Sequence, residues 1–465
     1  MPERCPSHAR RTRIIARRTG CAAAALLALG GCPAPNASDN PAVDSSGNPN
    51  GLTIWDGVGT SGTSGGATGD TGGSPAGVGG SAAGGSGTGG TSSGTSGTGN
   101  TGGGDTGGSS GSGGTTGGSG GASTPSYPAG DSGPAYFRPL GDVPGGLFFN
   151  DAFGVSADGG VVAGRSRPHG ANVAQAFRAT RGGPTESLGF LDANARQSVA
   201  HAVSADGLVI VGQSLTAQGF LAFRWTINGM VSLGDLGGGE TRSAAYATSM
   251  DGSVVVGFAA SAAGYEAFRW TQAGGMGGLG DLPGGQYESA ATGVSEDGAV
   301  VAGYGSAAAG DQAFIWTSAG GMQGIPLLSG GQMSRAMAIS PDGKVVVGFG
   351  DSDLGVAAFR WDAGGGSVAL GTLPGGERIS QALGVSRDGA VIVGTSGSTL
   401  GFEAFIWDAV HGMRKLSDVL SVDYQLNLAG WRLVSAYAVT ADGKTIVGYG
   451  INPMAIGEAW VAHLQ

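Results

Sequence analysis

Few side chains in this 465-residue chain have the types and spacing that catalysis requires. Gly130-Asp131-Ser132-Gly133 has the form of a serine-nucleophile loop, but Pro134 stands where a second glycine would follow, and no catalytic histidine accompanies it. Gly443-Lys444-Thr445 ends like a phosphate-binding loop, yet Ala438 occupies the position of its first glycine. Acids that could serve a glycan hydrolase or lyase lack supporting spacing; they are Glu240, Glu266, Glu288 and Glu403. We expect no catalytic residues, no cofactor and no enzyme activity.

Metal ligands are equally sparse. The histidines beyond residue 32 have no partner four residues away and no nearby cysteine, which argues against a zinc site; they are His169, His201, His411 and His463. Asp351, Asp353 and Asp362 lack the dense spacing of a calcium loop, so we interpret them as solvated acids. His201 occupies a strand position where other repeats carry alanine or threonine, which predicts a partly buried histidine rather than a ligand.

Cys32 is the residue for which the sequence predicts a covalent modification. Basic residues precede a short apolar core at 21–29, and Leu29-Gly30-Gly31-Cys32 is typical of a bacterial lipoprotein signal, in which the cysteine becomes the lipidated first residue. The apolar run is too short to span a bilayer. Pro33, in place of the aspartate that often marks inner-membrane retention, favours the outer membrane. We expect a signal peptide at 1–31 and an exported chain, lipid-anchored to the outer membrane or cell surface of a Gram-negative-type bacterium.

Removal of that signal changes the charge. Six arginines and one glutamate leave, so 18 basic and 33 acidic side chains remain and the net charge becomes about −15. Such a charge repels polyanions, so nucleic acid is not an expected partner. Cys5 and Cys21 also leave, which excludes a disulfide within the mature chain. Residues 32–134 are mainly glycine, serine and threonine, which predicts a disordered tether ahead of one domain at 135–465.

An internal repeat determines the elements that must position any site. Asp-Gly pairs recur at intervals of 48, 45, 46, 45, 46 and 54 residues; they begin at Asp158, Asp206, Asp251, Asp297, Asp342, Asp388 and Asp442. Each pair lies in a Val-Ser-x-Asp-Gly-x-Val-Val-Val-Gly-like segment. A period in the mid-forties indicates a repeat architecture.

Each repeat predicts four short antiparallel strands. Around Asp206, strands at 199–204 and 208–212 should be joined by a two-residue Asp-Gly hairpin, and a looser polar loop should lead to strands at 222–225 and 230–233. The second strands are apolar without alternation, which indicates sheets covered on both faces. We therefore expect an all-β, seven-bladed β-propeller, with an open β-solenoid as the alternative.

The two ends of the repeat region look incomplete in complementary ways. Residues 137–146 parallel a fourth strand and the connection that follows it, whereas 458–461 parallel a third strand with no fourth behind it. We expect the N-terminal strand at 137–140 to close the last blade beside the segment around Trp460. A tryptophan series is expected to pack between blades; it comprises Trp225, Trp270, Trp316, Trp361, Trp407 and Trp460, with Ala179 near that position in the first repeat.

These units resemble the HAF repeat of predicted extracellular bacterial proteins. The matching pieces are Gly-Asp-Leu-Pro-Gly-Gly at 280–285, Ala-x-x-Val-Ser-x-Asp-Gly at 291–298 and Ala-Phe-Arg-Trp at 267–270. The resemblance covers 140–461, with departures at 191–193, at 326–328 and at Thr372. It implies secretion and a repeat fold, and it brings no catalytic residues.

Turn alternation predicts where recognition would occur. The Asp-Gly turns and the third-to-fourth-strand turns should share one face, and the second-to-third-strand loops and the connections between repeats should share the other. Those second-to-third loops differ between repeats, which favours them for binding; they span 213–221, 258–266, 304–312, 349–357 and 395–403. Residues 423–428 of the longest interval should join the same face. Candidate ligand contacts are Trp431, Tyr424, Tyr265, Glu266, Phe402 and Glu403, although Trp431 and the insert could instead pack over the seam.

The sequence thus favours a surface-anchored, non-enzymatic protein that binds an envelope or extracellular protein or glycan. One alternative is a structural or assembly component of the outer membrane. The other is a propeller hydrolase or lyase acting on glycans.

Overall fold

The computed structural model describes residues 133–143, 146–168 and 173–465. The predicted signal peptide, Cys32, His169 and nearly all of the predicted tether lie outside these residues. The regular elements of the described residues are β-strands apart from two short helical segments, and none of the helical segments has the length and apolar character needed to cross a membrane.

The strands follow the repeats in order. Repeat 1 comprises β2 (Gly146–Val155), β3 (Val161–Pro168), β4 (Gln175–Thr180) and β5 (Thr185–Ser187), and repeat 2 comprises β6 (Ser198–Val203), β7 (Ile210–Thr216), β8 (Gly219–Thr226) and β9 (Gly229–Gly234). Repeat 3 comprises β10 (Ser243–Thr248), β11 (Val254–Ala260), β12 (Tyr265–Thr271) and β13 (Gly275–Gly278), and repeat 4 comprises β14 (Gly284–Val294), β15 (Val300–Ala307), β16 (Gly310–Thr317) and β17 (Gly321–Gly324). Repeat 5 comprises β18 (Ser334–Ile339), β19 (Val345–Ser352), β20 (Gly355–Asp362) and β21 (Gly366–Ala369), and repeat 6 comprises β22 (Ser380–Val385), β23 (Ile392–Ser398), β24 (Gly401–Asp408) and β25 (Gly412–Lys415). Repeat 7 comprises β26 (Arg432–Val439), β27 (Thr445–Ile451) and β28 (Gly457–His463), and β1 (Tyr136–Pro139) precedes them all.

Hydrogen bonding groups these strands into five four-stranded sheets and one eight-stranded sheet. The larger sheet consists of repeats 3 and 4, which a single parallel pair between Tyr265 and Glu288 connects. The sheet of repeat 7 has the order β1-β28-β27-β26, with Phe137 opposite Ala462 and Pro139 opposite Trp460. The predicted pairing of the N-terminal strand with the end of the chain is therefore confirmed.

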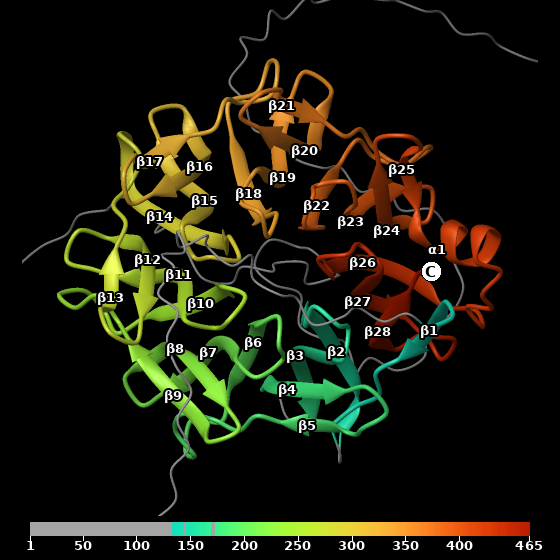
Figure 1. The fold of residues 1–465 in the computed structure, drawn as a ribbon, viewed down its shortest axis with the longest axis horizontal. Helices are drawn as coiled ribbons and strands as arrows, with labels where there is room; N and C mark the ends of the chain where they lie inside the picture. Colours follow the sequence, from blue (N-terminus) through green and yellow to red (C-terminus); the bar gives the residue numbers. More distant parts are fainter. Residues whose placement is uncertain (1–132, 144–145, 169–172) are drawn as a thin grey trace, which may run out of the picture. The chain divides into compact units, whose positions relative to one another are not determined.

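The sheets lie around a common centre, with the first strand of each repeat innermost (Figure 1). Each first strand contacts the first strand of the next repeat, and β26 of repeat 7 contacts β2 of repeat 1, so the series closes on itself. This arrangement is a β-propeller, and the open solenoid is excluded.

A recurring side-chain bridge links neighbouring repeats. Ser243, at the start of β10, accepts a hydrogen bond from the Ala222 N–H at 2.8 Å and donates one to the Gly234 carbonyl at 2.6 Å. Four other first strands carry a buried serine that accepts the equivalent alanine N–H; these are Ser198, Ser289, Ser334 and Ser380. In repeat 1 the residue is Asn150, which pairs with Ala459 of β28. The bridge satisfies backbone groups that burial would otherwise leave unpaired.

The fully buried aromatic series consists of phenylalanines, not tryptophans. Each ring lies opposite a glycine of the second strand, as Phe223 lies opposite Gly212, where an added Cβ would come within 2.9 Å of the ring. Trp460 lies opposite Gly448 and therefore occupies the phenylalanine position, while Ala462 occupies the tryptophan position. The remaining tryptophans pack between neighbouring repeats as predicted but are only partly buried; they are Trp225, Trp270, Trp316, Trp361 and Trp407.

The lengths of two connections are the reverse of the prediction: the Asp-Gly turns are wider than expected, and the second-to-third-strand connections are tighter. Four residues separate the paired ends of the first two strands, since the Ser204 N–H donates to the Val209 carbonyl at 2.8 Å. Asp206 accepts from Ser204 Oγ at 2.5 Å and from the Leu208 N–H at 2.9 Å, and these bonds hold the wider turn. The second-to-third connections of repeats 2 to 6, expected to be loose loops, are two-residue hairpins such as the one between Thr216 and Gly219.

The predicted sharing of faces is confirmed at both ends. Arg181, after β4, donates its N–H to the Gly160 carbonyl at 2.8 Å and so links the third-to-fourth turn to the Asp-Gly turn. At the opposite end, one cavity is lined both by the Ser352–Gly355 hairpin and by Thr372 of a connection between repeats. We call these the turn end and the hairpin end of the domain.

Candidate functional site

The centre of the domain is filled by residues of β-bulges. Every first strand has a bulge at the same position, and the extra residues are Phe153, His201, Tyr246, Thr292, Met337, Leu383 and Tyr437. The His201 ring lies 5.2 Å from Tyr246 and 6.0 Å from Phe153, centroid to centroid. This enclosure, together with the nearby Arg165, lowers the pKa of His201 to about 3, so the ring is neutral at physiological pH. The predicted partial burial of His201 is confirmed.

The turn end is uniform. Its Asp-Gly turns share one Ser or Thr to Asp hydrogen bond, as between Ser295 and Asp297 at 2.5 Å. Backbone bonds pass from turn to turn, for example from the Glu296 N–H to the Pro341 carbonyl at 2.8 Å. Pro341 has no N–H to continue this series, and Arg387 of repeat 6 instead reaches Glu296 of repeat 4 at 2.5 Å.

The hairpin end carries a cluster of paired charged and aromatic side chains from repeats 3 to 5. The Arg242 guanidinium lies 5.5 Å from the centre of the Tyr265 ring and donates to Tyr265 Oη at 3.3 Å. Tyr265 in turn donates to the carboxylate of Glu240. We call these three residues, together with Glu288, Tyr304, Asp311 and Arg335, the hairpin-end cluster.

The second half of the hairpin-end cluster again combines an arginine, a tyrosine ring and a carboxylate. Arg335, on β18, lies 4.5 Å from the centre of the Tyr304 ring, and its Nε is 2.6 Å from Asp311 Oδ2. Burial and the nearby Asp311 raise the pKa of Glu288, which lies opposite Tyr265 and so stands between the two halves. Burial also raises the pKa of Tyr304 to about 12. Arginine and tyrosine dominate binding energy at many protein interfaces, and here both are already oriented.

The predicted contact residues of repeats 3 and 6 are only partly brought to this cluster. Tyr265 belongs to it, but Glu266 accepts a hydrogen bond from the Gly280 N–H at 2.8 Å and so supports a connection. Glu403 is 6% exposed, and its Oε2 is 2.7 Å from Lys415 Nζ, which leaves little of it for a ligand. Phe402 is half-buried at the hairpin end of repeat 6.

Trp431 and Tyr424 pack over the closing seam. The insert of the longest interval forms α1 (Leu416–Asp418) and a π-helical turn, η1 (Val419–Asp423), and both aromatic residues pack against the core cluster around Leu416 and Trp460. Trp431 meets the ring of Phe137 of β1 edge-on, at 5.5 Å between centroids. Both residues therefore pack over the seam, as the alternative describes, and each remains only partly buried.

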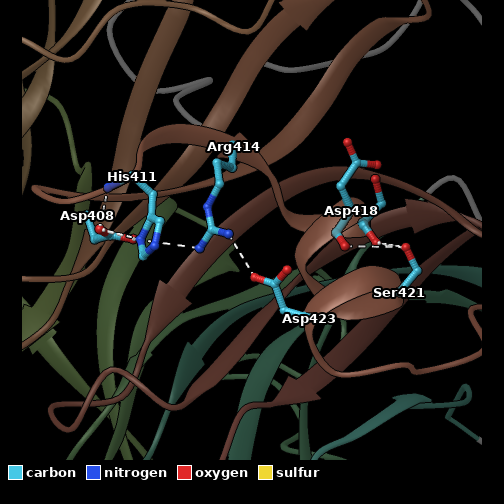
Figure 2. Close-up of polar contacts among 7 residues, drawn as sticks. Asp408, His411, Arg414, Asp418, Ser421 and Asp423 are labelled. Atoms are coloured by element: carbon cyan, nitrogen blue, oxygen red, sulfur yellow. Dashed lines mark hydrogen bonds and ion pairs between the residues drawn. The ribbon is translucent and has the colours of Figure 1, made fainter.

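Polar contacts fasten the insert to repeat 6. Figure 2 shows Arg414 between Asp408 and Asp423, and its Nη1 lies 2.7 Å from Asp423 Oδ2. His411 Nδ1 lies 2.9 Å from both carboxylate oxygens of Asp408. Partial burial would raise the pKa of Asp408, but hydrogen bonds from His411 and Val410 hold it below its usual value. The contacts are those of a structural clamp on the insert.

The four acids proposed for a hydrolase or lyase do not all lie together. Glu240 and Glu288 belong to the hairpin-end cluster, Glu266 supports a connection, and Glu403 is buried in repeat 6. Asp351 and Asp362 likewise separate, since Asp351 accepts the Met333 N–H and Asp362 pairs with Arg360. Within the described ranges, no three histidine, cysteine or acidic side chains gather closely enough to hold a metal ion.

Sequence reasoning missed Arg242, Arg335, Tyr304 and Asp311. Their signal was a departure from the repeat: Arg335 stands where repeats 3 and 4 carry alanine, at Ala244 and Ala290. Arg242 and Arg335 can be recognised as parts of one cluster only once the structure shows that repeats 3 to 5 lie side by side.

Cavities occur at both ends of the described domain. At the hairpin end, about 330 Å³ is lined by Leu354, Thr372 and Arg378 among others. At the turn end, about 700 Å³ lies around Trp361.

Comparisons with known proteins give fold likeness only. No family model and no curated protein matches the chain. Among solved structures, TolB from Acinetobacter baumannii is 14% identical with a TM-score of 0.41, and the match covers 54% of this chain and 62% of that one, less than two thirds of its length. The β-propeller domain of the trilobed protease from Pyrococcus furiosus is 14% identical with a TM-score of 0.40, covering 57% and 79%. Oligogalacturonate lyase from Vibrio parahaemolyticus is 9% identical with a TM-score of 0.42, covering 72% and 98%. Likeness at this level assigns no function.

Proposed function

We propose that the chain is an exported, lipid-anchored protein whose seven-bladed propeller binds a partner in the envelope or outside the cell, without catalysis. Cys32 would carry the lipid and residues 32–134 would be the tether. The resemblance to HAF repeats belongs to the same proposal, since it implies secretion and a repeat fold.

The observation that carries the proposal is the contrast between the two ends of the domain. The turn end repeats one hydrogen-bond pattern in every repeat. The hairpin end differs from repeat to repeat and presents Arg242 paired with Tyr265 and Arg335 stacked on the buried ring of Tyr304. Differences placed on a repeated scaffold are where recognition is usually located.

A protein partner suits this cluster better than a glycan substrate. Each acid of the two pairs is already held by tyrosine or arginine, as Glu240 is by Tyr265 and Asp311 by Arg335. Paired acids offer oriented hydrogen bonds, whereas glycoside hydrolysis needs two acids free to exchange protons across a sugar.

The test uses the full-length protein immobilised through its lipid end. Cross-linking to envelope extracts should capture a defined protein, and Tyr265→Ala combined with Arg335→Ala should abolish that capture. The matched control is Leu208→Ala, which changes an exposed side chain at the turn end and should leave capture intact. Capture that survives the double substitution would contradict the proposed face. Glycan turnover that is lost on Glu288→Gln would replace the binding function with an enzymatic one.

A further inference from the structure

Trp361 differs from the other tryptophans of the series in the type of side chain that the preceding repeat places against it. In repeats 1 to 3, an arginine one place before the tryptophan position reaches the next repeat. In repeat 1 this residue is Arg178, which precedes Ala179 and stacks over Trp225 at 5.7 Å. Arg224 donates to the Gly252 carbonyl of the next turn at 3.2 Å, and Arg269 donates to the Gly298 carbonyl at 3.1 Å. Three successive junctions are thus each filled by a guanidinium.

Ile315 replaces this arginine at the junction between repeats 4 and 5. It packs with Val300 and the partly buried Trp361 of repeat 5. Isoleucine is shorter than arginine and cannot donate a hydrogen bond. A cavity of about 700 Å³ opens there, lined by Ile315, Thr317, Gly343 and Trp361 together with neighbouring residues. Gly343 is the turn glycine equivalent to Gly252 and Gly298.

The walls of this cavity carry one more acidic than basic side chain. Three carboxylates line it, from Asp342, Asp362 and Asp388, against the two cationic side chains of Arg360 and Lys344. Arg360 is engaged by Asp362, and the exposed Lys344 lies 3.1 Å from Asp342. Asp388 accepts hydrogen bonds from Ser386 and Ala390 of its own turn.

We propose that this slot binds an arginine side chain of a protein partner. The incoming guanidinium would stack on Trp361, as Arg178 does on Trp225, and donate to the Gly343 carbonyl, as Arg224 and Arg269 do to the equivalent carbonyls. It would also face the acidic side chains of the cavity wall. Arginine suits the slot better than lysine because its planar group both stacks and donates in fixed directions. The slot lies at the turn end, so it is a second contact site beyond the proposed function of the hairpin end.

The probe is a capped Gly-Arg-Gly peptide, added to full-length protein whose tryptophans carry ¹⁵N. The indole resonance of Trp361, assigned with Trp361→Phe, should shift and saturate at millimolar peptide, as expected for a single side chain. The equivalent lysine peptide should bind several-fold more weakly, and Gly-Gly-Gly should cause no shift. The Trp361 response should be unchanged in Tyr265→Ala, which separates this site from the hairpin end.

Two substitutions test the slot itself. Ile315→Arg supplies the guanidinium from within the chain and should weaken peptide binding about tenfold or more, while Ile406→Arg, which faces Ala462 instead of a tryptophan, should leave binding unchanged. Arg224→Ile should open an equivalent slot and make the Trp270 resonance respond. An unresponsive Trp361 in the native protein, equal binding of the lysine peptide, or undiminished binding by folded Ile315→Arg protein would each overturn the proposal.

Discussion

Asn150 offers the sharpest test of how the ring closes. Its Oδ1 accepts the Ala459 N–H at 2.5 Å, its Nδ2 donates to the Gly141 carbonyl at 2.5 Å, and the side chain is fully buried. Asn150→Ala removes both bonds and leaves a buried N–H without a partner, which should lower the free energy of unfolding by about 2–4 kcal/mol.

The matched comparison is Ser243→Ala, which removes the same two bonds at a junction inside the chain. Urea unfolding followed by tryptophan fluorescence should give losses of similar size for the two variants. Asn150→Ser should recover part of the loss, because serine forms the bridge at other junctions. A loss below about 0.5 kcal/mol for Asn150→Ala, beside a full loss for Ser243→Ala, would refute the view that this bridge stabilises closure, since surface-like changes have effects of that size.

Other consequences can be measured with the same unfolding assay. Phe268→Ala should cost about 3–5 kcal/mol and Trp270→Ala clearly less, because the phenylalanine is fully buried and the tryptophan two residues later is not; equal losses would contradict the assigned core. Lys415→Met should cost about 3 kcal/mol, since it leaves the buried Glu403 unpaired, whereas Lys344→Met at an exposed pair should change little. Hydrogen bonds from Ser295 and the Ala299 N–H hold the pKa of Asp297 below 3.8. Asp297 should therefore stabilise the fold above that pH and lose this contribution as the pH falls through its lowered value, so Asp297→Asn should flatten the acid side of the stability profile. An unchanged acid profile in that variant would show that the turn carboxylates do not contribute.

The repeats were predictable because their turn residues and apolar strands recur at a near-constant spacing. The strand order and the pairing of β1 with β28 follow from that spacing and from the complementary ends of the repeat region. The degree of burial of individual aromatic side chains could not be predicted from that spacing. Trp460 lies opposite Gly448 just as Phe405 lies opposite Gly394, whereas Trp407 lies two places further along its strand, opposite Ile392. This difference in register separates a fully buried ring from a partly buried one.

The turns and the candidate site were harder to predict for a related reason. The bonds of Ser204 with Asp206 hold a wider turn than a bare Asp-Gly pair suggests. The hairpin-end cluster draws Arg242, Tyr265 and Arg335 from different repeats, and a scan along the chain compares equivalent positions rather than residues that meet in space. Tyr265 was found because it is aromatic in a variable segment, whereas the arginines beside it appeared only as irregularities.

The position of β1 also determines where tension would act on the domain. β1 is an edge strand that pairs only with β28, and it is the first strand of the described chain. A pull arriving along the preceding residues would load this strand's hydrogen bonds before those of any inner strand. Under such a force β1 would separate from β28 first, while the strands of the other sheets stay paired.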